Sequence, residues 1–141
     1  MFYRIGLAAL LAAVTTIAAA AQPNMQPGRW EYTNTMSFSG AVNVPEKQYT
    51  HTQCVTREDI EEADTFLRDA EQCRVEDRRL ASDNVAYTMV CPGPQGSEMR
   101  TRVEMQVMGD RVTGDARATL RMNDQSMEMV TAIEGRRVGD C

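Results

Sequence analysis

The chain has 141 residues, with 15 basic and 20 acidic side chains and a net charge of −5. This length is typical of a single domain. A net negative charge argues against a nucleic-acid-binding role, because affinity for the phosphate backbone comes from Lys and Arg.

Residues 1–21 have the pattern of a cleaved secretory signal peptide. Arg4 supplies a positive charge near the start, an uncharged apolar stretch follows, and the small residues Ala19-Ala20-Ala21 stand just before Gln22. The alternative is an uncleaved anchor, but the stretch is short and weakly apolar for a bilayer span. We therefore expect a single mature domain over residues 22–141, located in the periplasm and without a stable membrane anchor.

The first two strands follow this leader. Alternation of apolar and polar residues begins at Trp30 and predicts a half-buried strand whose inward face carries Trp30, Tyr32, Met36 and Phe38. After a turn over residues 40–45, residues 46–54 form a second, more polar strand, which suits the edge of a sheet.

One helix is predicted next. Thr56 can act as its N-cap, with Asp59 three residues later in the place of a capping-box Glu. Spacings of three and four then place one apolar stripe on the helix, formed by Ile60, Ala63, Leu67 and Ala70.

A hairpin follows over residues 73–80 and 84–91. If it is symmetric about Ser82, Cys73 lies directly opposite Cys91, at a separation that a disulfide can span. This geometry favours a Cys73–Cys91 bridge.

The remaining cysteines complete a disulfide framework. The chain has four cysteines, an even number that indicates disulfides in an exported protein. The spacing between them is too wide for the paired ligands of a zinc site. Of the three possible connectivities we favour Cys73–Cys91 with Cys54–Cys141, so no free thiol is expected.

Three further strands end the chain as an antiparallel meander. Short turns at Gly109-Asp110 and Asn123-Asp124 separate three alternating segments. Their inward positions are Met99, Thr101, Val103, Met105 and Val107, then Val112, Gly114, Ala116, Ala118, Leu120 and Met122, then Met127, Met129, Thr131 and Ile133.

The expected sheet is too wide for its helix. About six or seven strands span roughly 25 to 30 Å, whereas one short helix is about 10 to 12 Å thick. The sheet must therefore curl on itself, pair with a partner or hold an apolar ligand. The expected fold is mainly β, an α+β arrangement with one short helix and a curved antiparallel sheet or half-barrel.

Several sequence features resemble a known family. They are Gly28-Arg29-Trp30-Glu31, Gln53-Cys54-Val55-Thr56, the isolated Cys73 and Cys91, and the ending from Gly135 to Cys141. Together they resemble the domain of unknown function number 3617, found in exported proteins of Gram-negative bacteria. The resemblance implies export and a disulfide-containing β domain, and it implies no activity.

Candidate catalytic and metal chemistry is sparse. His51 is the only histidine and is expected to be a surface strand residue. Met105, Met127 and Met129 could offer thioethers to Cu(I), but their inward positions favour core packing. No phosphate loop or dinucleotide fingerprint occurs, so we expect no cofactor and no enzymatic activity.

Arginines are expected on the outer face of the late strands. Cross-strand ion pairs are the expected reason for this set, which consists of Arg100, Arg102, Arg117 and Arg121 among Glu98, Glu104 and Asp115. Arg136 and Arg137 could meet an acidic partner.

The sequence thus favours a non-catalytic periplasmic domain that binds an apolar or amphipathic ligand, or an envelope protein, on its curved face. Small inward residues leave room for such a ligand. The candidate binding residues are Gly114, Ala116, Ala118, Met105, Met127 and Met129. The alternatives are soft-metal binding through the methionines and a purely structural envelope role; the oligomeric state is left open.

Overall fold

The computed structural model describes residues 21–40, 44–62, 72–122 and 124–141. The expected leader, except Ala21, and the second half of the expected helix lie outside these residues. Within the described ranges, none of the helices has the length and apolar character needed to cross a membrane.

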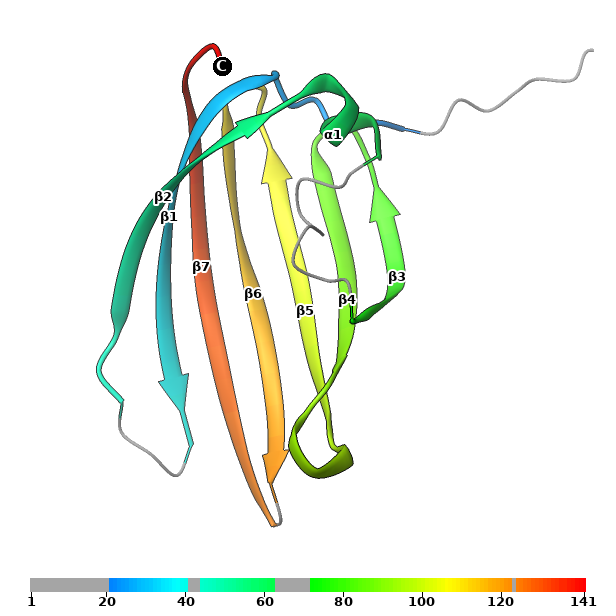
Figure 1. Ribbon diagram of the computed structural model, residues 1–141, viewed down its shortest axis with the longest axis vertical. Helices are drawn as coiled ribbons and strands as arrows, with labels where there is room; N and C mark the ends of the chain where they lie inside the picture. The colour runs from blue at the N-terminus through cyan, green and yellow to red at the C-terminus, as the bar shows by residue number, and fades with distance from the viewer. Residues whose placement is uncertain (1–20, 41–43, 63–71, 123) are drawn as a thin grey trace, which may run out of the picture.

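Seven antiparallel strands form one sheet in the order β2-β1-β7-β6-β5-β4-β3 (Figure 1). Strands β3 to β7 follow one another as a meander, and the β1–β2 hairpin joins it through β7. The strands are β1 (Gly28–Ser39), β2 (Lys47–Val55), β3 (Arg74–Leu80), β4 (Asn84–Pro92), β5 (Glu98–Val107), β6 (Arg111–Met122) and β7 (Gln125–Gly139).

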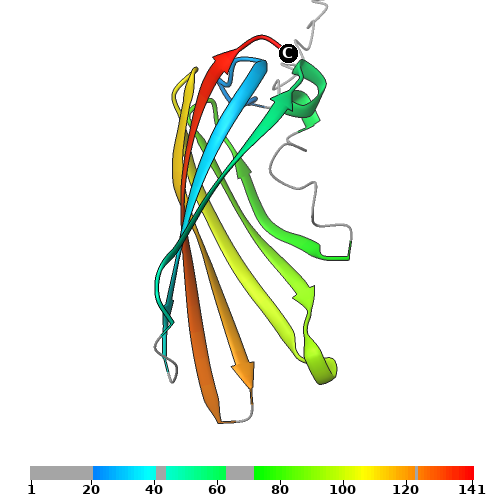
Figure 2. The same cartoon turned by 60° about the vertical axis from the view of Figure 1, so that its left-hand side comes forward.

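The sheet is curved into an open trough rather than closed into a barrel (Figure 2). Strands β2 and β3 form its two edges. This arrangement confirms the expected mainly β fold with a curved sheet, including the expected edge position of the second strand.

The apolar face lies on the inside of this curve. The expected alternation is confirmed, because Trp30, Val103, Met105 and Val112 are buried while the intervening side chains point outward. Buried residues from β1, β4, β5 and β6 form one continuous core cluster. The curvature thus lets the sheet bury its own inner face.

Gly114 marks a close approach of β6 to β5. It lies opposite Met105, and an added Cβ would overlap the carbonyl oxygen of Glu104 and lie 2.7 Å from the Cα of Met105. Its small size therefore serves strand packing, and not open space above the sheet.

One short helix, α1 (Arg57–Glu62), follows β2 and lies near one end of the trough (Figure 1). The expected capping box is present. The Asp59 amide donates to Thr56 Oγ1 at 3.2 Å, and the Thr56 amide donates to Asp59 Oδ2 at 2.8 Å. Ile60 is buried against the core, as its place on the apolar stripe predicted.

Both favoured disulfides are confirmed. Cys73 and Cys91 have their Cα atoms 4.3 Å apart, and Cys54 and Cys141 have theirs 5.8 Å apart. The first bridge joins the start of β3 to the end of β4. The second ties the end of β2 to the chain end beyond β7.

The hairpin register agrees with symmetry about Ser82 only near the disulfide. Arg74 pairs with Val90, but the register shifts by one between Glu76 and Arg79, so that Leu80 pairs with Val85. Asp77 lies in this irregularity with a φ of 52°. A bulge therefore separates the disulfide end of the hairpin from its turn.

Candidate ligand-binding site

A hollow of about 340 Å³ lies on the inner face of the trough. Side chains from β1, β2, β4, β5, β6 and β7 line it. Strands β2 and β4 are separated by four strands in the sheet, so only its curvature brings their side chains around one space. The apolar part of the wall consists of Met89, Val103, Met105, Ala116 and Ile133.

Polar side chains are buried in the same wall. Tyr32 and Asn34 are each 6% exposed, Thr101 is 8% exposed and Thr131 is 9% exposed. They stand at inward positions of β1, β5 and β7, where apolar residues are the rule. The wall of the hollow therefore has both apolar and polar parts.

The hydroxyl of Tyr32 is buried and forms no hydrogen bond with any residue in the described part of the chain. An unsatisfied buried hydroxyl costs about 1 to 3 kcal/mol of stability. Burial also raises the pKa of Tyr32, because the phenolate would lose its hydration. Tyr32 is thus a neutral donor and acceptor in the wall of the hollow.

An aromatic stack leads from this tyrosine to the sheet edge. The ring of His51 stacks on that of Tyr32 with centroids 5.3 Å apart, and Tyr49 stacks on His51 at 6.2 Å. The Asn34 Nδ2 lies 3.4 Å from the His51 Nδ1. His51 is exposed on a strand, as expected, but it faces the inside of the trough, where it lines the hollow.

Charged side chains are confined to other surfaces. Among the described residues that line the hollow there is no Asp, Glu, Lys or Arg. Tyr87, also in the wall, has a pKa raised to about 12 by burial. The buried tyrosines of the wall are consequently neutral around neutral pH.

The structure brings together only part of the binding set expected from the sequence. Met105 and Ala116 line the hollow. Gly114 instead packs against β5, and Ala118 is buried with 3% exposure. Further along β7, Met127 pairs with Leu120 and Met129 with Ala118, and neither methionine lines the hollow.

The sequence interpretation missed the polar members of the wall. Asn34 occupies the inward position between Tyr32 and Met36, and Thr101 and Thr131 occupy inward positions of their strands. A polar residue at an inward position was the available signal. The sequence alone could not show that these three polar residues face one hollow, because the curvature of the sheet brings them together.

Of the methionines proposed as soft-metal ligands, Met105 lies too far from Met127 and Met129 to share an ion with them. Met105 pairs with Gly114, which pairs with Ile133, and Met129 is four residues from Ile133 on β7. That offset corresponds to about 13 Å along the strand. Within the described ranges, no group of three His, Cys, Asp or Glu side chains could hold a metal ion either.

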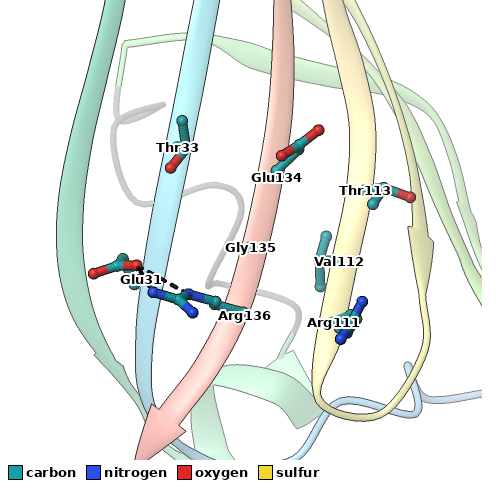
Figure 3. Close-up of a pocket in the computed structure, with 8 residues that line it drawn as sticks. All are labelled: Glu31, Thr33, Arg111, Val112, Thr113, Glu134, Gly135 and Arg136. Atoms are coloured by element: carbon teal, nitrogen blue, oxygen red, sulfur yellow. Dashed lines mark hydrogen bonds and ion pairs between the residues drawn. The ribbon is translucent and has the colours of Figure 1, made fainter.

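The outer face carries a second depression, of about 480 Å³, over β1, β7 and β6 (Figure 3). Arg136 donates to Glu31 at 2.6 Å across it, and both side chains are well exposed, at 69% and 34%. Thr33, Glu134 and Thr113 stand beside this pair on neighbouring strands (Figure 3). Exposed ion pairs of this kind are weak and solvated, so we do not regard this depression as a binding site.

The expected arginines do line the outer face of the late strands, where Arg100, Arg102, Arg117 and Arg121 border one depression. Arg100 does pair across strands, but with a carboxylate outside the expected set, because its Nη2 lies 2.7 Å from Glu76 Oε2 on β3. Arg74 and Arg100 lower the pKa of Glu76 through hydrogen bonds to its carboxylate.

The same expectation is wrong for two of these arginines. Arg102 pairs with Glu104 at 2.6 Å and Arg117 with Asp115 at 2.8 Å, each within its own strand. The register explains this result, because it places Arg102 opposite Arg117 and Glu104 opposite Asp115. Like charges therefore face each other across the strands, and each arginine turns to the carboxylate two residues away.

The two arginines near the chain end have different surroundings. Arg136 forms its ion pair on the outer face, whereas Arg137 donates through Nε to the carbonyl of Pro27 at 2.8 Å and pairs with Asp140. An added Cβ on Gly28 would lie 2.5 Å from the Arg137 Nε, so glycine makes room for this contact. Through this hydrogen bond, Arg137 connects the end of β7 to the residue just before β1.

Comparison with family models gives one match. The model described as a protein of unknown function, DUF3617, matches residues 25–141. This span includes all seven strands and both disulfides. Comparisons with curated proteins and with solved structures found no match. The chain therefore belongs to the DUF3617 family, a family of unknown function.

Proposed function

We propose that this protein is an exported, non-catalytic binding domain that holds an apolar or amphipathic ligand in the hollow of its trough. The observation that carries the proposal is the combination of apolar walls with buried polar groups, above all the Tyr32 hydroxyl. Sites for small molecules are typically concave and mostly apolar, with a few polar groups that orient the ligand.

The size of the hollow supports a ligand rather than a filled core. Its volume of about 340 Å³ falls near the lower end of the range of about 300 to 1,000 Å³ for small-molecule sites. The lining comes from one rigid sheet held by two disulfides. Such a site is preorganised, which lowers the entropic cost of binding.

The surroundings of His51 support binding without catalysis. A histidine that acts as a general base is usually oriented by a carboxylate. The ring of His51 instead stacks between Tyr32 and Tyr49, and its Nδ1 lies near the amide of Asn34. These contacts suit an aromatic wall.

Two features support export. Residues 1–21 have the pattern of a signal peptide, and all four cysteines are paired in disulfides, which persist in oxidising compartments. If the leader is cleaved as proposed, the mass of the protein recovered from the periplasm corresponds to a chain that begins at Gln22.

The binding proposal is tested with the neutral dye N-phenyl-1-naphthylamine, whose fluorescence rises in apolar surroundings. We expect saturable binding to the wild type and about a tenfold weaker affinity for Ala116→Phe, because the larger side chain fills the hollow. The matched control is Ala132→Phe. Ala132 is exposed on β7 and points to the outer face, so this variant should bind like the wild type.

Native mass spectrometry of the protein purified from the periplasm gives a second readout. A bound small molecule that is lost in Ala116→Phe supports the proposal. Absence of dye binding to the wild type, or equal binding to Ala116→Phe, contradicts it and leaves an envelope protein or a structural role as the alternative.

A further inference from the structure

The wall of the hollow contains hydrogen-bonding groups that the protein itself does not fully use. The Tyr32 hydroxyl has no partner among the described residues, and Tyr32 lines the hollow together with Asn34. The Nδ2 of Asn34 lies 3.4 Å from the Nδ1 of His51, a long distance for a hydrogen bond. A ligand with an oxygen acceptor would satisfy a donor that is otherwise buried without a partner.

The same wall offers no fixed counter-charge. In the part of the chain that the structure describes, no Asp, Glu, Lys or Arg lines it, and the arginines of the late strands lie on the opposite face of the sheet. A carboxylate, phosphate or ammonium group in the hollow would lose hydration without gaining an ion pair, which is strongly unfavourable. The wall therefore discriminates against charged head groups.

Apolar side chains adjoin these donors. Met89, Met105 and Ile133 reach the hollow from three strands. Methionine side chains adapt to irregular apolar shapes, so they suit an acyl chain or a small apolar ring. The polar group and the apolar body of one ligand can thus be accommodated side by side.

We propose, resting on the function proposed above, that the ligand is an uncharged amphiphile whose hydroxyl or carbonyl oxygen accepts a hydrogen bond from Tyr32. Its apolar part lies against Met89, Met105 and Ile133. A fatty alcohol or a fatty ester fits this description, whereas a fatty acid anion or a cationic amphiphile does not.

The head-group preference is tested by displacement of the bound naphthylamine dye with three amphiphiles of equal chain length: dodecanol, dodecanoate and dodecyltrimethylammonium. All three titrations are run at the same pH, about 8, at which dodecanoate is ionised. We expect dodecanol to displace the dye at a concentration at least about tenfold lower than either charged compound.

The two proposals fail in different ways in this experiment. If dodecanoate or the ammonium compound displaces the dye as well as dodecanol does, the inference about an uncharged ligand is wrong, while binding in the hollow stands. If the dye binds but dodecanol does not displace it, the inference about the ligand is wrong as well, and binding in the hollow again stands. If the dye does not bind, both proposals are overturned.

Tyr32→Phe tests the hydrogen bond. It removes the hydroxyl and keeps the ring, which stacks on His51 and covers Gly135. We expect the affinity for dodecanol to fall about fivefold to tenfold, the usual effect of one lost hydrogen bond. The matched control is Thr33→Val, which deletes a hydroxyl from the outer face of the same strand.

The control should bind dodecanol like the wild type. Unchanged affinity in Tyr32→Phe contradicts the assigned hydrogen bond, as does an equal loss in Thr33→Val. Dye binding by each variant, together with a wild-type circular dichroism spectrum, shows that the fold is intact.

Discussion

Gly114 shows how one small side chain shapes the sheet. A Cβ at this position would lie 2.7 Å from the Cα of Met105 and would overlap the Glu104 carbonyl. Backbone atoms of a central strand cannot yield as the end of a flexible side chain can. The steric cost of any larger residue therefore falls on the pairing of β5 and β6.

We expect Gly114→Ala to lower the free energy of unfolding by about 1 to 3 kcal/mol, the usual range for an overpacked interior. Urea unfolding followed by the fluorescence of Trp30, the single tryptophan, measures this change. Thr113→Ala is the control, because Thr113 is exposed on the same strand and should change stability by less than about 0.5 kcal/mol. Equal stability of the two variants would show that β5 and β6 are not so closely apposed.

Because of its buried tyrosines, the protein loses stability as the pH rises through the alkaline range. Burial raises the pKa of Tyr87 to about 12, whereas an unfolded chain has an ordinary tyrosine pKa of about 10. Between these values the folded state keeps a proton that the unfolded state releases. Because the unfolded state then binds fewer protons, stability is complete below about pH 10 and falls as the pH rises towards 12.

We expect the free energy of unfolding to decrease more steeply between about pH 10 and pH 12 in the wild type than in Tyr87→Phe. Urea unfolding at several pH values, with tyrosinate absorbance recorded in parallel, measures both slopes. Identical slopes would mean that Tyr87 ionises as readily in the folded protein as in the unfolded chain.

At the scale of the elements, two disulfides close loops of very different length. Cys73 and Cys91 are 18 residues apart in sequence, and Cys54 and Cys141 are 87 apart. In the chain-entropy view, a bridge stabilises mainly by restricting the unfolded chain, and more so for a longer loop. The long bridge also joins the edge strand β2 to the chain end, on either side of β1 in the sheet.

We expect the double variant Cys73→Ser, Cys91→Ser to lose about 3 kcal/mol of unfolding free energy, and Cys54→Ser, Cys141→Ser about 4.5 kcal/mol. Urea unfolding under non-oxidising conditions gives both values. A larger loss from the short bridge would contradict the loop-length argument and would point to native-state packing as the main contribution.

Local sequence pattern predicted most elements because each strand has one buried face. Period-two alternation located strands such as β5 and β6, and turn residues located their ends. The position of Cys73 opposite Cys91 followed from hairpin symmetry near the bridge. The bulge at Asp77 did not, since nothing in that polar strand pattern marks an extra residue.

Long-range features were beyond such reasoning. The pairing of β1 with β7 joins opposite ends of the chain, and no short-range pattern encodes it. Without that pairing, Tyr32 and Ile133 could not be recognised as neighbours of Met105 in one hollow. The direction of the Arg102 and Arg117 ion pairs likewise depended on a register known only from the sheet.

At the scale of the whole molecule, curvature solves the problem of a wide apolar sheet with little helix to cover it. The trough buries its own inner face at the core cluster, and residues of that cluster help to line a hollow whose walls are apolar in part and polar in part. The outer face of the late strands carries charges, with Arg100, Arg102 and Arg117 in exposed ion pairs. The described residues that line the hollow include no Asp, Glu, Lys or Arg. The central claim is therefore that an uncharged amphiphile binds in this hollow.

Methyl NMR of the protein with ¹³C-labelled methionines, recorded during addition of dodecanol, tests this claim most directly. Met89 and Met105 line the hollow, whereas Met108 is 50% exposed beyond the end of β5 and Met25 is buried near the start of the domain. We expect saturable shifts of the Met89 and Met105 methyl signals, with those of Met25 and Met108 unchanged. Saturation without shifts at Met89 and Met105, or shifts at Met108 alone, would place the ligand elsewhere and contradict the account.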